Sequence, residues 1–468
     1  MTTLFDKVWK KHVIRELGDG VVLLHIDRHY LHDLEGGPNL HRIEQLGYRV
    51  HNPELTFATP DHAISTLPPP AVEATGRGLD LLHQLRLQTK RAGVRLFDMR
   101  ERGHGIVHVM APELGLTLPG MTVACPDSHT CTHGGLGALG LAIGSSEVAH
   151  ILATQTLRQR RPKQMRIVYT GTLAFGVTAK DLILATIGLL GTAAGRGFAV
   201  EFAGEPIARF TVDERLTFCN LTIELGSRTG LIAPDDTTFS YLAEKEYAPK
   251  GRDFDRAVAQ WRQLPTDPES HFDVEHHIDV SKIGPQISWG TSPQDVIAID
   301  GKVPDPASQT DPKLRQRMVD ALAYMGLKPG APMDGLPIDW VFIGSCTNAR
   351  LSDLRRAASL LKGRKIAPNV RAWVVPGSED TKRSAEAEGL HEIFIQAGFE
   401  WRMPGCSMCL AANGEVVPPG QRSISTTNRN FVGRQGPGAR THLASPEMAA
   451  AAAVVGKITD ARQMMVAG

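Results

Sequence analysis

Apolar runs alternate with amphipathic segments in the middle of the chain. Met165–Tyr169 and Phe198–Phe202 are short, largely apolar runs of the kind that form strands. Between them, Thr178 is a candidate N-cap for a helix from Ala179 to Leu190, and Gly191 is placed to end that helix. The strand–helix–strand order predicts an α/β fold from about residue 163 onward.

The same order recurs nearer the C-terminus. Asp339–Gly344 (DWVFIG) contains the apolar run expected of a buried parallel strand. The turn Ser345–Asn348 follows, and then a predicted helix at Ser352–Lys362 and a predicted strand at Val370–Val375. Residues 445–455 (SPEMAAAAAVV) begin with a Ser N-cap and a Pro at the first helical position, and they predict an Ala-rich helix over 448–455.

Chain length and composition suggest how these elements are grouped. At 468 residues the chain is too long for one core, and about three units of ~150 residues each are expected. The stretch 241–285 is polar and predicts surface loops and a helix, whereas 300–336 is proline-rich and predicts in part a linker. We therefore predict three domains with boundaries at 1–162, 163–290 and 291–468.

Charge and hydropathy exclude several classes of protein. Lys and Arg total 51 against 50 Asp and Glu, which gives a net charge of +1 and no basic excess for nucleic acid. The start, Met1–Leu17, is amphipathic and lacks the apolar run of a signal peptide. The longest apolar runs, Leu182–Leu190 and Ala449–Val455, fall short of the ~20 residues that span a bilayer. The sequence predicts a cytoplasmic or, at most, a soluble organellar protein.

Six cysteines are too few for a disulfide framework in a chain of this length. Cys346 lies where a predicted strand turns into a helix, a place where thiolates are stabilised. Cys406 and Cys409 lie in a CxxC turn after Pro and Gly, which alone fits a redox dithiol, half of a zinc site, an iron–sulfur site or chance. Three thiolates fit a four-iron cluster with one open iron, and the remaining cysteines are interpreted as small buried residues.

Other polar residues are candidates for a site. Most of the 18 histidines lie in the first 150 residues, many beside Asp or Gly in turn-rich segments, which favours a polar pocket. Arg429 and Arg434 flank a glycine and are either carboxylate-binding forks or solvated surface residues. Glu224 lies in an otherwise apolar stretch and is either a helix-terminal charge or a buried functional carboxylate.

Taken together, the motifs resemble the aconitase superfamily, and within it the large subunits of the isopropylmalate dehydratase family. The resemblance covers essentially the whole chain. It is carried by FATPDH (57–62), GIVHV (105–109), PDSHT (126–130), THGGLG (132–137), TAKDLIL (178–184), EFAGEPI (201–207), CNLTIELG (219–226), APDDTTFSYL (233–242), GSCTNARLSDL (344–354), MPGCSMCL (403–410), NRNFVGRQG (428–436) and THLASPEMAAAAAVVG (441–456).

This resemblance implies three aconitase-like α/β/α domains around one 4Fe–4S cluster per chain, held by three cysteines with one open iron. The implied cluster ligands are Cys346, Cys406 and Cys409. The implied catalytic residues form three groups. Asp61 and His62 are an acid–imidazole pair beside the substrate hydroxyl. His108, Asp127 and His129 line the cluster and its water, and Glu224 lies near the open iron. The implied substrate-binding residues are Asp27, Ser128, Arg429 and Arg434.

Single-chain members of the superfamily carry a fourth, swivelling domain that supplies the base serine and a further arginine. The chain ends soon after the predicted helix 448–455, so the resemblance implies a separate small subunit and an inactive isolated chain. Four features depart from the family pattern. They are Ala63 in place of Asn, Pro126 in place of Gly, Cys131 in place of Ser or Pro, and the loop 30–37, which lacks the usual Thr or Ser.

The function expected from these residues is that of a hydro-lyase subunit. It would interconvert 2- and 3-isopropylmalate by dehydration and rehydration in leucine biosynthesis, with a small dicarboxylate or hydroxy-acid substrate, no nucleic acid and no membrane. One alternative is a paralogue for methylmalate/citraconate or homoaconitate. Alternatives from other classes are an apo-form RNA-binding protein and a structural zinc protein.

Overall fold

The computed structural model describes residues 1–69 and 71–465, and these form two compact units. The first unit comprises Met1–Ile64, Glu73–Gly171 and Ala193–Asp279, and the second comprises the described parts of Ser65–Val72, Thr172–Thr192 and Val280–Gly468. The domain boundaries at 162 and 290 stay a prediction.

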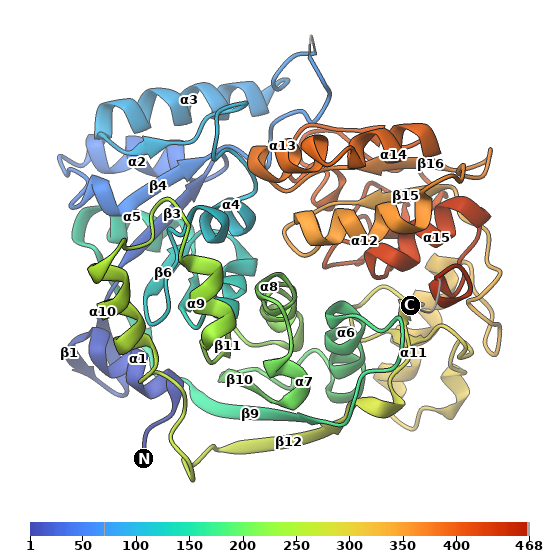
Figure 1. Cartoon of the computed structure of the whole chain (residues 1–468), viewed down its shortest axis with the longest axis horizontal. Helices are drawn as coiled ribbons and strands as arrows, with labels where there is room; N and C mark the ends of the chain where they lie inside the picture. The colour runs from blue at the N-terminus through green and yellow to red at the C-terminus, as the bar shows by residue number, and fades with distance from the viewer. Residues whose placement is uncertain (70, 466–468) are drawn as a thin grey trace. The chain divides into compact units, whose positions relative to one another are not determined.

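The first unit contains a five-stranded sheet in the order β5-β4-β3-β6-β7, in which all neighbouring strands are parallel. Its strands are β3 (Arg28–His32), β4 (Thr56–Thr59), β5 (Arg95–Leu96), β6 (Thr122–Cys125) and β7 (Leu139–Ala142). Helix α2 (Gly36–Gln45) packs between α3 (Arg77–Ala92) and α5 (Ser145–Thr154), as Figure 1 shows. Because the strands are parallel, the carboxyl ends of β3, β4 and β6 lie at one edge of the sheet.

Two further sheets belong to the first unit. A parallel sheet has the order β11-β10-β9-β12, and an antiparallel sheet has the order β1-β2-β8. Their strands are β1 (Val13–Gly18), β2 (Val21–His25), β8 (Thr156–Arg160), β9 (Lys163–Thr170), β10 (Phe198–Gly204), β11 (Thr229–Ile232) and β12 (Val274–Asp279). The remaining helices are α1 (Leu4–His12), η1 (Pro53–Leu55), α4 (Val107–Leu114), η2 (Ser128–Leu136), α7 (Glu205–Ala208), α8 (Val212–Asn220), η3 (Leu221–Leu225), α9 (Asp236–Leu242) and α10 (Arg252–Trp261).

The second unit is built on a parallel sheet in the order β17-β16-β15-β18-β19 and a small β13-β14 hairpin. Its strands are β13 (Gln286–Ser288), β14 (Val296–Ala298), β15 (Trp340–Ile343), β16 (Arg371–Val374), β17 (Glu400–Trp401), β18 (Arg422–Ser425) and β19 (Arg440–Leu443). Its helices are α6 (Ala179–Leu190), η4 (Val280–Lys282), η5 (Pro306–Ser308), α11 (Pro312–Met325), α12 (Leu351–Leu361), α13 (Glu379–Ala387), α14 (Leu390–Ala397), η6 (Ser407–Cys409), α15 (Pro446–Val455) and η7 (Ala461–Gln463).

Several sequence-based element predictions are confirmed. Helix α6 has the predicted bounds, and Thr178 and Asp181 form a capping box at its start. Helix α15 begins after the Ser445 N-cap, and its fully buried alanines let it pack closely on α12 and β15. The parallel sheets confirm the predicted α/β class.

Two elements lie where the sequence predicts mainly loop. Strand β12 pairs with β9 at the edge of its sheet. Its positions alternate between exposed and less exposed, and Ile278 is its one buried residue, so its sequence (VEHHID) is largely polar. Helix α11 begins at Pro312, directly after the Asp311 N-cap, so this proline starts a helix instead of interrupting one. The interpretation of 300–336 as a partial linker is wrong for these residues.

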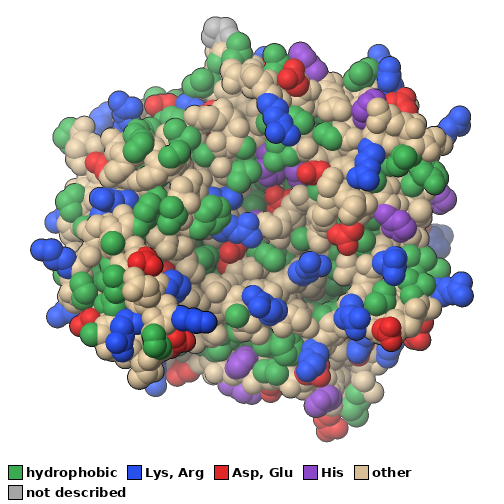
Figure 2. All heavy atoms as spheres, turned by 180° about the vertical axis from the view of Figure 1, so that it is seen from behind, with side chains coloured by type: hydrophobic (Ala, Val, Ile, Leu, Met, Phe, Trp, Pro, Cys, Tyr) green, Lys and Arg blue, Asp and Glu red, His purple; other side chains and the backbone are tan. Residues whose placement is uncertain are grey.

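No helix within residues 1–69 and 71–465 has both the length and the hydropathy needed to cross a bilayer. On the face shown in Figure 2, basic and acidic side chains are interspersed with hydrophobic ones, in keeping with the net charge of +1.

Candidate active site

Three neighbouring parallel strands of the first unit deliver polar residues to one edge of their sheet. His32 ends β3 and Asp33 follows it, Asp61 and His62 come just after β4, and Asp127 comes just after β6. The topology of the sheet therefore gathers segments that are far apart in sequence.

Asp127 is the centre of a hydrogen-bond network. Its Oδ1 accepts from His108 Nε2 at 3.0 Å and from the backbone N–H of His129 at 2.7 Å. Its Oδ2 lies 3.3 Å from His62 Nε2. Burial alone would raise the pKa of Asp127, but hydrogen bonds and charge from these histidines outweigh it and hold the pKa well below its ordinary value. Asp127 is therefore a carboxylate at neutral pH.

His62 lies between two carboxylates. Its Nδ1 donates to Asp61 Oδ1, and its Nε2 faces Asp127. Since a carboxylate only accepts, these two contacts favour a proton on each ring nitrogen, which is the imidazolium form. Burial alone would lower the pKa of His62, but the charges of Asp61 and Asp127 outweigh it and raise the pKa well above the ordinary value. The site thus holds a proton on His62.

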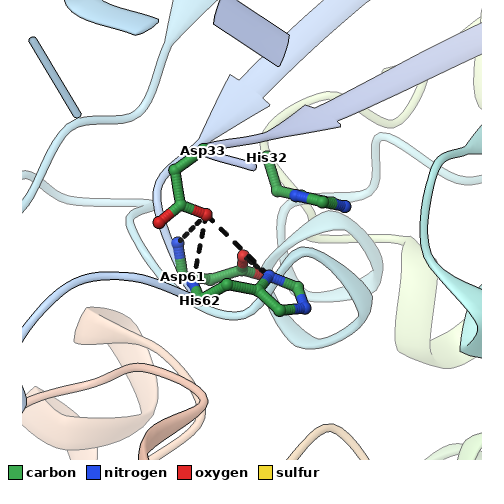
Figure 3. Close-up of side chains that lie close together, drawn as sticks. All are labelled: His32, Asp33, Asp61 and His62. Atoms are coloured by element: carbon green, nitrogen blue, oxygen red, sulfur yellow. Dashed lines mark hydrogen bonds and ion pairs between the residues drawn. The ribbon is translucent and has the colours of Figure 1, made fainter. Parts of the chain in front are cut away.

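Asp33 fixes the backbone that carries this pair. Its carboxylate is fully buried and accepts from the N–H groups of Asp61 at 3.4 Å, His62 at 3.1 Å and Ala63 at 2.6 Å. Figure 3 shows Asp33 aimed at the start of this turn, with the His32 ring beside the His62 ring. The position of the acid–imidazole pair therefore depends on a residue that sequence reasoning did not single out.

Glu224 joins the same network through His129. His129 Nε2 lies 3.1 Å from Glu224 Oε1, and His129 Nδ1 lies 3.1 Å from Ser128 Oγ. Glu224 is buried in the short helix η3. Six predicted residues, namely Asp61, His62, His108, Asp127, His129 and Glu224, are connected by these contacts, and Ser128 lies beside them.

Asp27 takes part in a different set of contacts. Its carboxylate accepts from the Thr122 backbone N–H at 2.9 Å and lies 2.7 Å from His12 Nε2. These contacts tie α1 to the start of β6 in the first unit. The predicted role of Asp27 in substrate binding stays a prediction.

The second unit brings its cysteines to the carboxyl ends of parallel strands. Cys346 follows β15, and Asn428 follows the neighbouring strand β18. Asn428 donates from Nδ2 to Cys346 Sγ at 3.4 Å and accepts from Cys409 Sγ at 3.9 Å. Cys406 and Cys409 bracket the turn η6, and all three cysteines are buried thiols. One asparagine thus links two of the predicted ligands.

The two candidate arginines lie on the segment after β18. Arg434 is buried and its NH2 lies 3.8 Å from Cys409 Sγ, while its Nε has no hydrogen-bond partner among the described residues. Arg429 is half-buried. The interpretation of Arg434 as a solvated surface residue is therefore wrong, and a buried guanidinium with an unused donor is suited to binding an anion.

The aconitase family model matches residues 6–456 of the chain, under the description aconitate hydratase. The chain belongs to the aconitase family. It is 62% identical over 462 residues, 99% of this chain and 97% of the relative, to the 3-isopropylmalate dehydratase large subunit 1 of Bradyrhizobium diazoefficiens. The chain is also 12% identical to the crystal structure of Thermococcus kodakaraensis aconitase X in its holo form, with a TM-score of 0.48 over 87% of this chain and 84% of that one. The predicted family is confirmed.

Proteins of the aconitase family typically carry a 4Fe–4S cluster, and Cys346, Cys406 and Cys409 are three buried thiols available to hold such a group. Thiolates that share one zinc ion at ~2.3 Å lie about 4 Å from one another. In the described part of the chain, the one group of three or more His, Cys, Asp or Glu residues with ligand atoms all within 4.8 Å of one another is that of His32, Asp33, Asp61 and His62. Cys346, Cys406 and Cys409 do not form such a group, which disfavours their sharing one zinc ion.

The His32–Asp33–Asp61–His62 set needs no ion to explain it. Asp33 accepts three backbone N–H groups, and Asp61 accepts from Val107 N at 3.0 Å as well as from His62. Opposite charges and hydrogen bonds within the set account for its compactness.

Lys180 is a second residue that sequence reasoning missed. Its Nζ is buried on α6 and donates to the carbonyl oxygens of Thr426 and Thr427, the latter at 2.8 Å. Burial lowers its pKa to about 7, although the Asp353 carboxylate and the thiols of Cys409 and Cys346 act in the opposite direction. A lysine within the apolar run of TAKDLIL was the available signal, because buried charges need partners.

The other three cysteines fit their interpretation as small buried residues. Burial raises the pKa of Cys125 and of Cys219 well above the ordinary value, which keeps both as neutral thiols. Cys131 Sγ donates to the Asn220 carbonyl at 3.4 Å. Two other departures from the family pattern have structural contacts. Ala63 contributes its backbone N–H to Asp33, and the Pro126 carbonyl accepts from His32 at 3.0 Å.

Proposed function

We propose that this chain is the large subunit of a 3-isopropylmalate dehydratase, a hydro-lyase of leucine biosynthesis. It interconverts 2- and 3-isopropylmalate by removing water and adding it back with the opposite regiochemistry. The observation that carries this proposal is the 62% identity to a large subunit of that name over 99% of the chain. His62 between two carboxylates, and Cys346 and Asn428 at the ends of the paired strands β15 and β18, fit the chemistry that such a reaction requires.

Cys346, Cys406 and Cys409 would hold one 4Fe–4S cluster with one iron free of protein ligands. That cluster supplies a Lewis acid for the departure of the substrate hydroxyl. The buried Asn428, in contact with Cys346 and Cys409, and the Arg434 guanidinium 3.8 Å from Cys409 would hold the thiolates and offset negative charge.

The proton required by the leaving hydroxyl comes from His62 in this proposal. Asp61 and Asp127 hold the ring as an imidazolium, so the acid is charged and oriented before substrate arrives. After donation, the same two carboxylates favour recapture of a proton, which suits a reaction that runs in both directions.

The remaining predicted residues orient this acid and bind substrate. His108, His129 and Glu224 fix Asp127 through the contacts described above. Arg429 and Arg434 bind substrate carboxylate, and Ser128 and Asp27 are proposed to contact substrate. Lys180 would hold the strand end at Thr426 and Thr427 that presents Asn428.

A separate small subunit would complete the enzyme by supplying a swivelling domain with the base serine. The name of the relative as a large subunit supports this proposal. We expect the chain reconstituted with iron and sulfide to show little turnover of 2-isopropylmalate alone. Adding the small subunit should raise kcat roughly a hundredfold or more, since a positioned base contributes 10²–10⁴ in rate.

Steady-state assays of the chain with and without the small subunit measure this difference. A small subunit whose base serine is replaced by alanine serves as the matched control, because it still docks and lacks only the base. Full turnover by the isolated chain would contradict the proposed division of the active site between subunits.

A further inference from the structure

A line of buried polar side chains begins at Asp127 Oδ1, whereas His62 faces Asp127 Oδ2. His108 Nδ1 lies 3.1 Å from His133 Nε2, His133 Nδ1 lies 2.9 Å from Thr117 Oγ1, and Thr117 Oγ1 lies 2.9 Å from the Tyr30 hydroxyl. All four side chains are at most 1% exposed. They come from α4, η2, the turn after α4, and β3, so four separate segments of the first unit meet here.

The surroundings of this line are apolar. Tyr30 and its neighbours belong to a hydrophobic cluster with Val107, Met110, Leu116 and Val123. The His133 ring lies edge-on to His108 at 5.1 Å and tilted against Tyr30 at 5.3 Å between centroids. Such a location would hold a leucine or phenylalanine without cost, whereas each buried polar group there must be hydrogen-bonded to avoid a penalty.

When both imidazoles are neutral, the contact with Asp127 determines which atom donates in each hydrogen bond of the line. Asp127 is a carboxylate and only accepts, so His108 carries its proton on Nε2 and accepts at Nδ1. His133 must then donate from Nε2 and accept at Nδ1. Thr117 therefore donates to His133, and Tyr30 donates to Thr117. Every contact in the line then has one donor and one acceptor.

The opposite tautomer of His108 would turn a lone pair toward Asp127. Asp127 Oδ1 would lose one of its two donors and keep only the His129 backbone N–H, and the carboxylate that faces His62 would be less firmly held. When His133 carries its proton on Nε2, that N–H occupies the position where a proton on His108 Nδ1 would point, and it therefore disfavours the opposite tautomer.

We propose that His133 is a positioning residue that fixes the tautomer of His108, and through it Asp127, with Thr117 and Tyr30 fixing His133 in turn. The kinetic part of this inference rests on the proposed function, whereas the tautomer itself can be observed in the chain alone. His133 acts on the reaction through two intervening side chains and does not itself touch the reacting atoms.

The test compares His133→Leu with His133→Gln. Leucine fills the space but offers no donor, whereas a glutamine amide donates toward His108 and its carbonyl accepts from Thr117. His29→Leu is the matched control, because His29 is a fully buried histidine of the same unit whose ring nitrogens have no hydrogen-bond partner within residues 1–69 and 71–465. Thr117→Val is a second test variant, which serves if the leucine variant does not fold.

The first readout is the ring ¹⁵N signals of His108 in the histidine-labelled full chain, assigned by their loss in His108→Gln. We expect wild type, His133→Gln and His29→Leu to show a protonated Nε2 and an unprotonated Nδ1. His133→Leu and Thr117→Val should show a mixture of the two tautomers.

The second readout is kcat and KM of the complete two-subunit enzyme. We expect kcat of His133→Leu to fall roughly ten- to a hundredfold with KM nearly unchanged, because a misplaced tautomer weakens the transition state more than substrate binding. His133→Gln should stay within about threefold of wild type. Unchanged His108 signals and unchanged kcat in a folded His133→Leu, or equal losses in the Leu and Gln variants, would overturn the inference. An inactive wild-type enzyme with the expected signals would instead count against the proposed function.

Discussion

Replacing Cys346 with serine is expected to abolish cluster binding and to lower dehydratase turnover by roughly a thousandfold or more. A Lewis-acid metal site contributes several kcal/mol to the transition state, and each 1.4 kcal/mol is a factor of ten in rate. Serine keeps the size of the side chain but is a poor ligand for iron. Because Cys346 follows the central strand β15 and its sulfur accepts from Asn428, its loss removes one corner of the site.

Iron and acid-labile sulfide per chain, measured after anaerobic reconstitution, check this result together with the kcat of the two-subunit enzyme. Cys219→Ser is the matched control, since Cys219 is also buried, and burial holds it as a neutral thiol in the first unit. A Cys346→Ser chain that retains full iron and sulfide would contradict the assignment of this cysteine as a ligand.

Replacing His62 with glutamine is expected to lower kcat by about 10²–10⁴-fold, the range that one general acid contributes. Glutamine can still donate to one carboxylate, but it cannot release a proton to a leaving hydroxyl. The fold should be retained, because Asp33 holds the turn through backbone N–H groups that the substitution leaves in place. The exposed His41→Gln is the control and should keep wild-type kcat.

The same residue predicts a pH effect with a definite sign. Asp61 and Asp127 raise the pKa of His62, so the active imidazolium persists well above pH 6.5 and is lost as pH rises through the raised pKa. The ion pair of His62 with the two carboxylates stabilises the fold fully below pH 6.5, the ordinary pKa of histidine. This stabilisation is lost as pH rises through the raised pKa of His62. Asp127→Asn removes one charge and should move the alkaline limb of kcat/KM to lower pH, by about one unit. A limb that stays in place, or moves to higher pH, would contradict His62 as the acid.

Local signals in the sequence predicted much of the fold. Thr178 and Asp181 define the start of α6, and the apolar run in DWVFIG gives β15, because capping and burial act over a few residues. The edge strand β12 and the helix α11 were not predicted, because the residues they pack against are distant in the sequence. β12 is stabilised by pairing with β9, and α11 buries one face with Met318 and Leu322.

The candidate site shows a similar division. Family motifs named Asp61, His108, Asp127, His129 and Glu224, and the structure connects these residues through hydrogen bonds and, for Asp61, through the contact of His62 with Asp127. Which of these residues become hydrogen-bond partners depends on the parallel strands β4, β3 and β6 being neighbours. No local sequence pattern reveals that strand order. Asp33 and His133 were missed because each acts on another part of the site: Asp33 holds the backbone of Asp61 and His62, and His133 contacts His108.

The assignment of 2-isopropylmalate as the substrate is tested most directly by the kcat/KM values of the anaerobically reconstituted two-subunit enzyme for 2-isopropylmalate, citraconate and homoaconitate, measured side by side. We expect 2-isopropylmalate to be preferred by at least about tenfold, the discrimination expected when a hydrophobic pocket accommodates a branched side chain. Equal or faster turnover of citraconate or homoaconitate would contradict it.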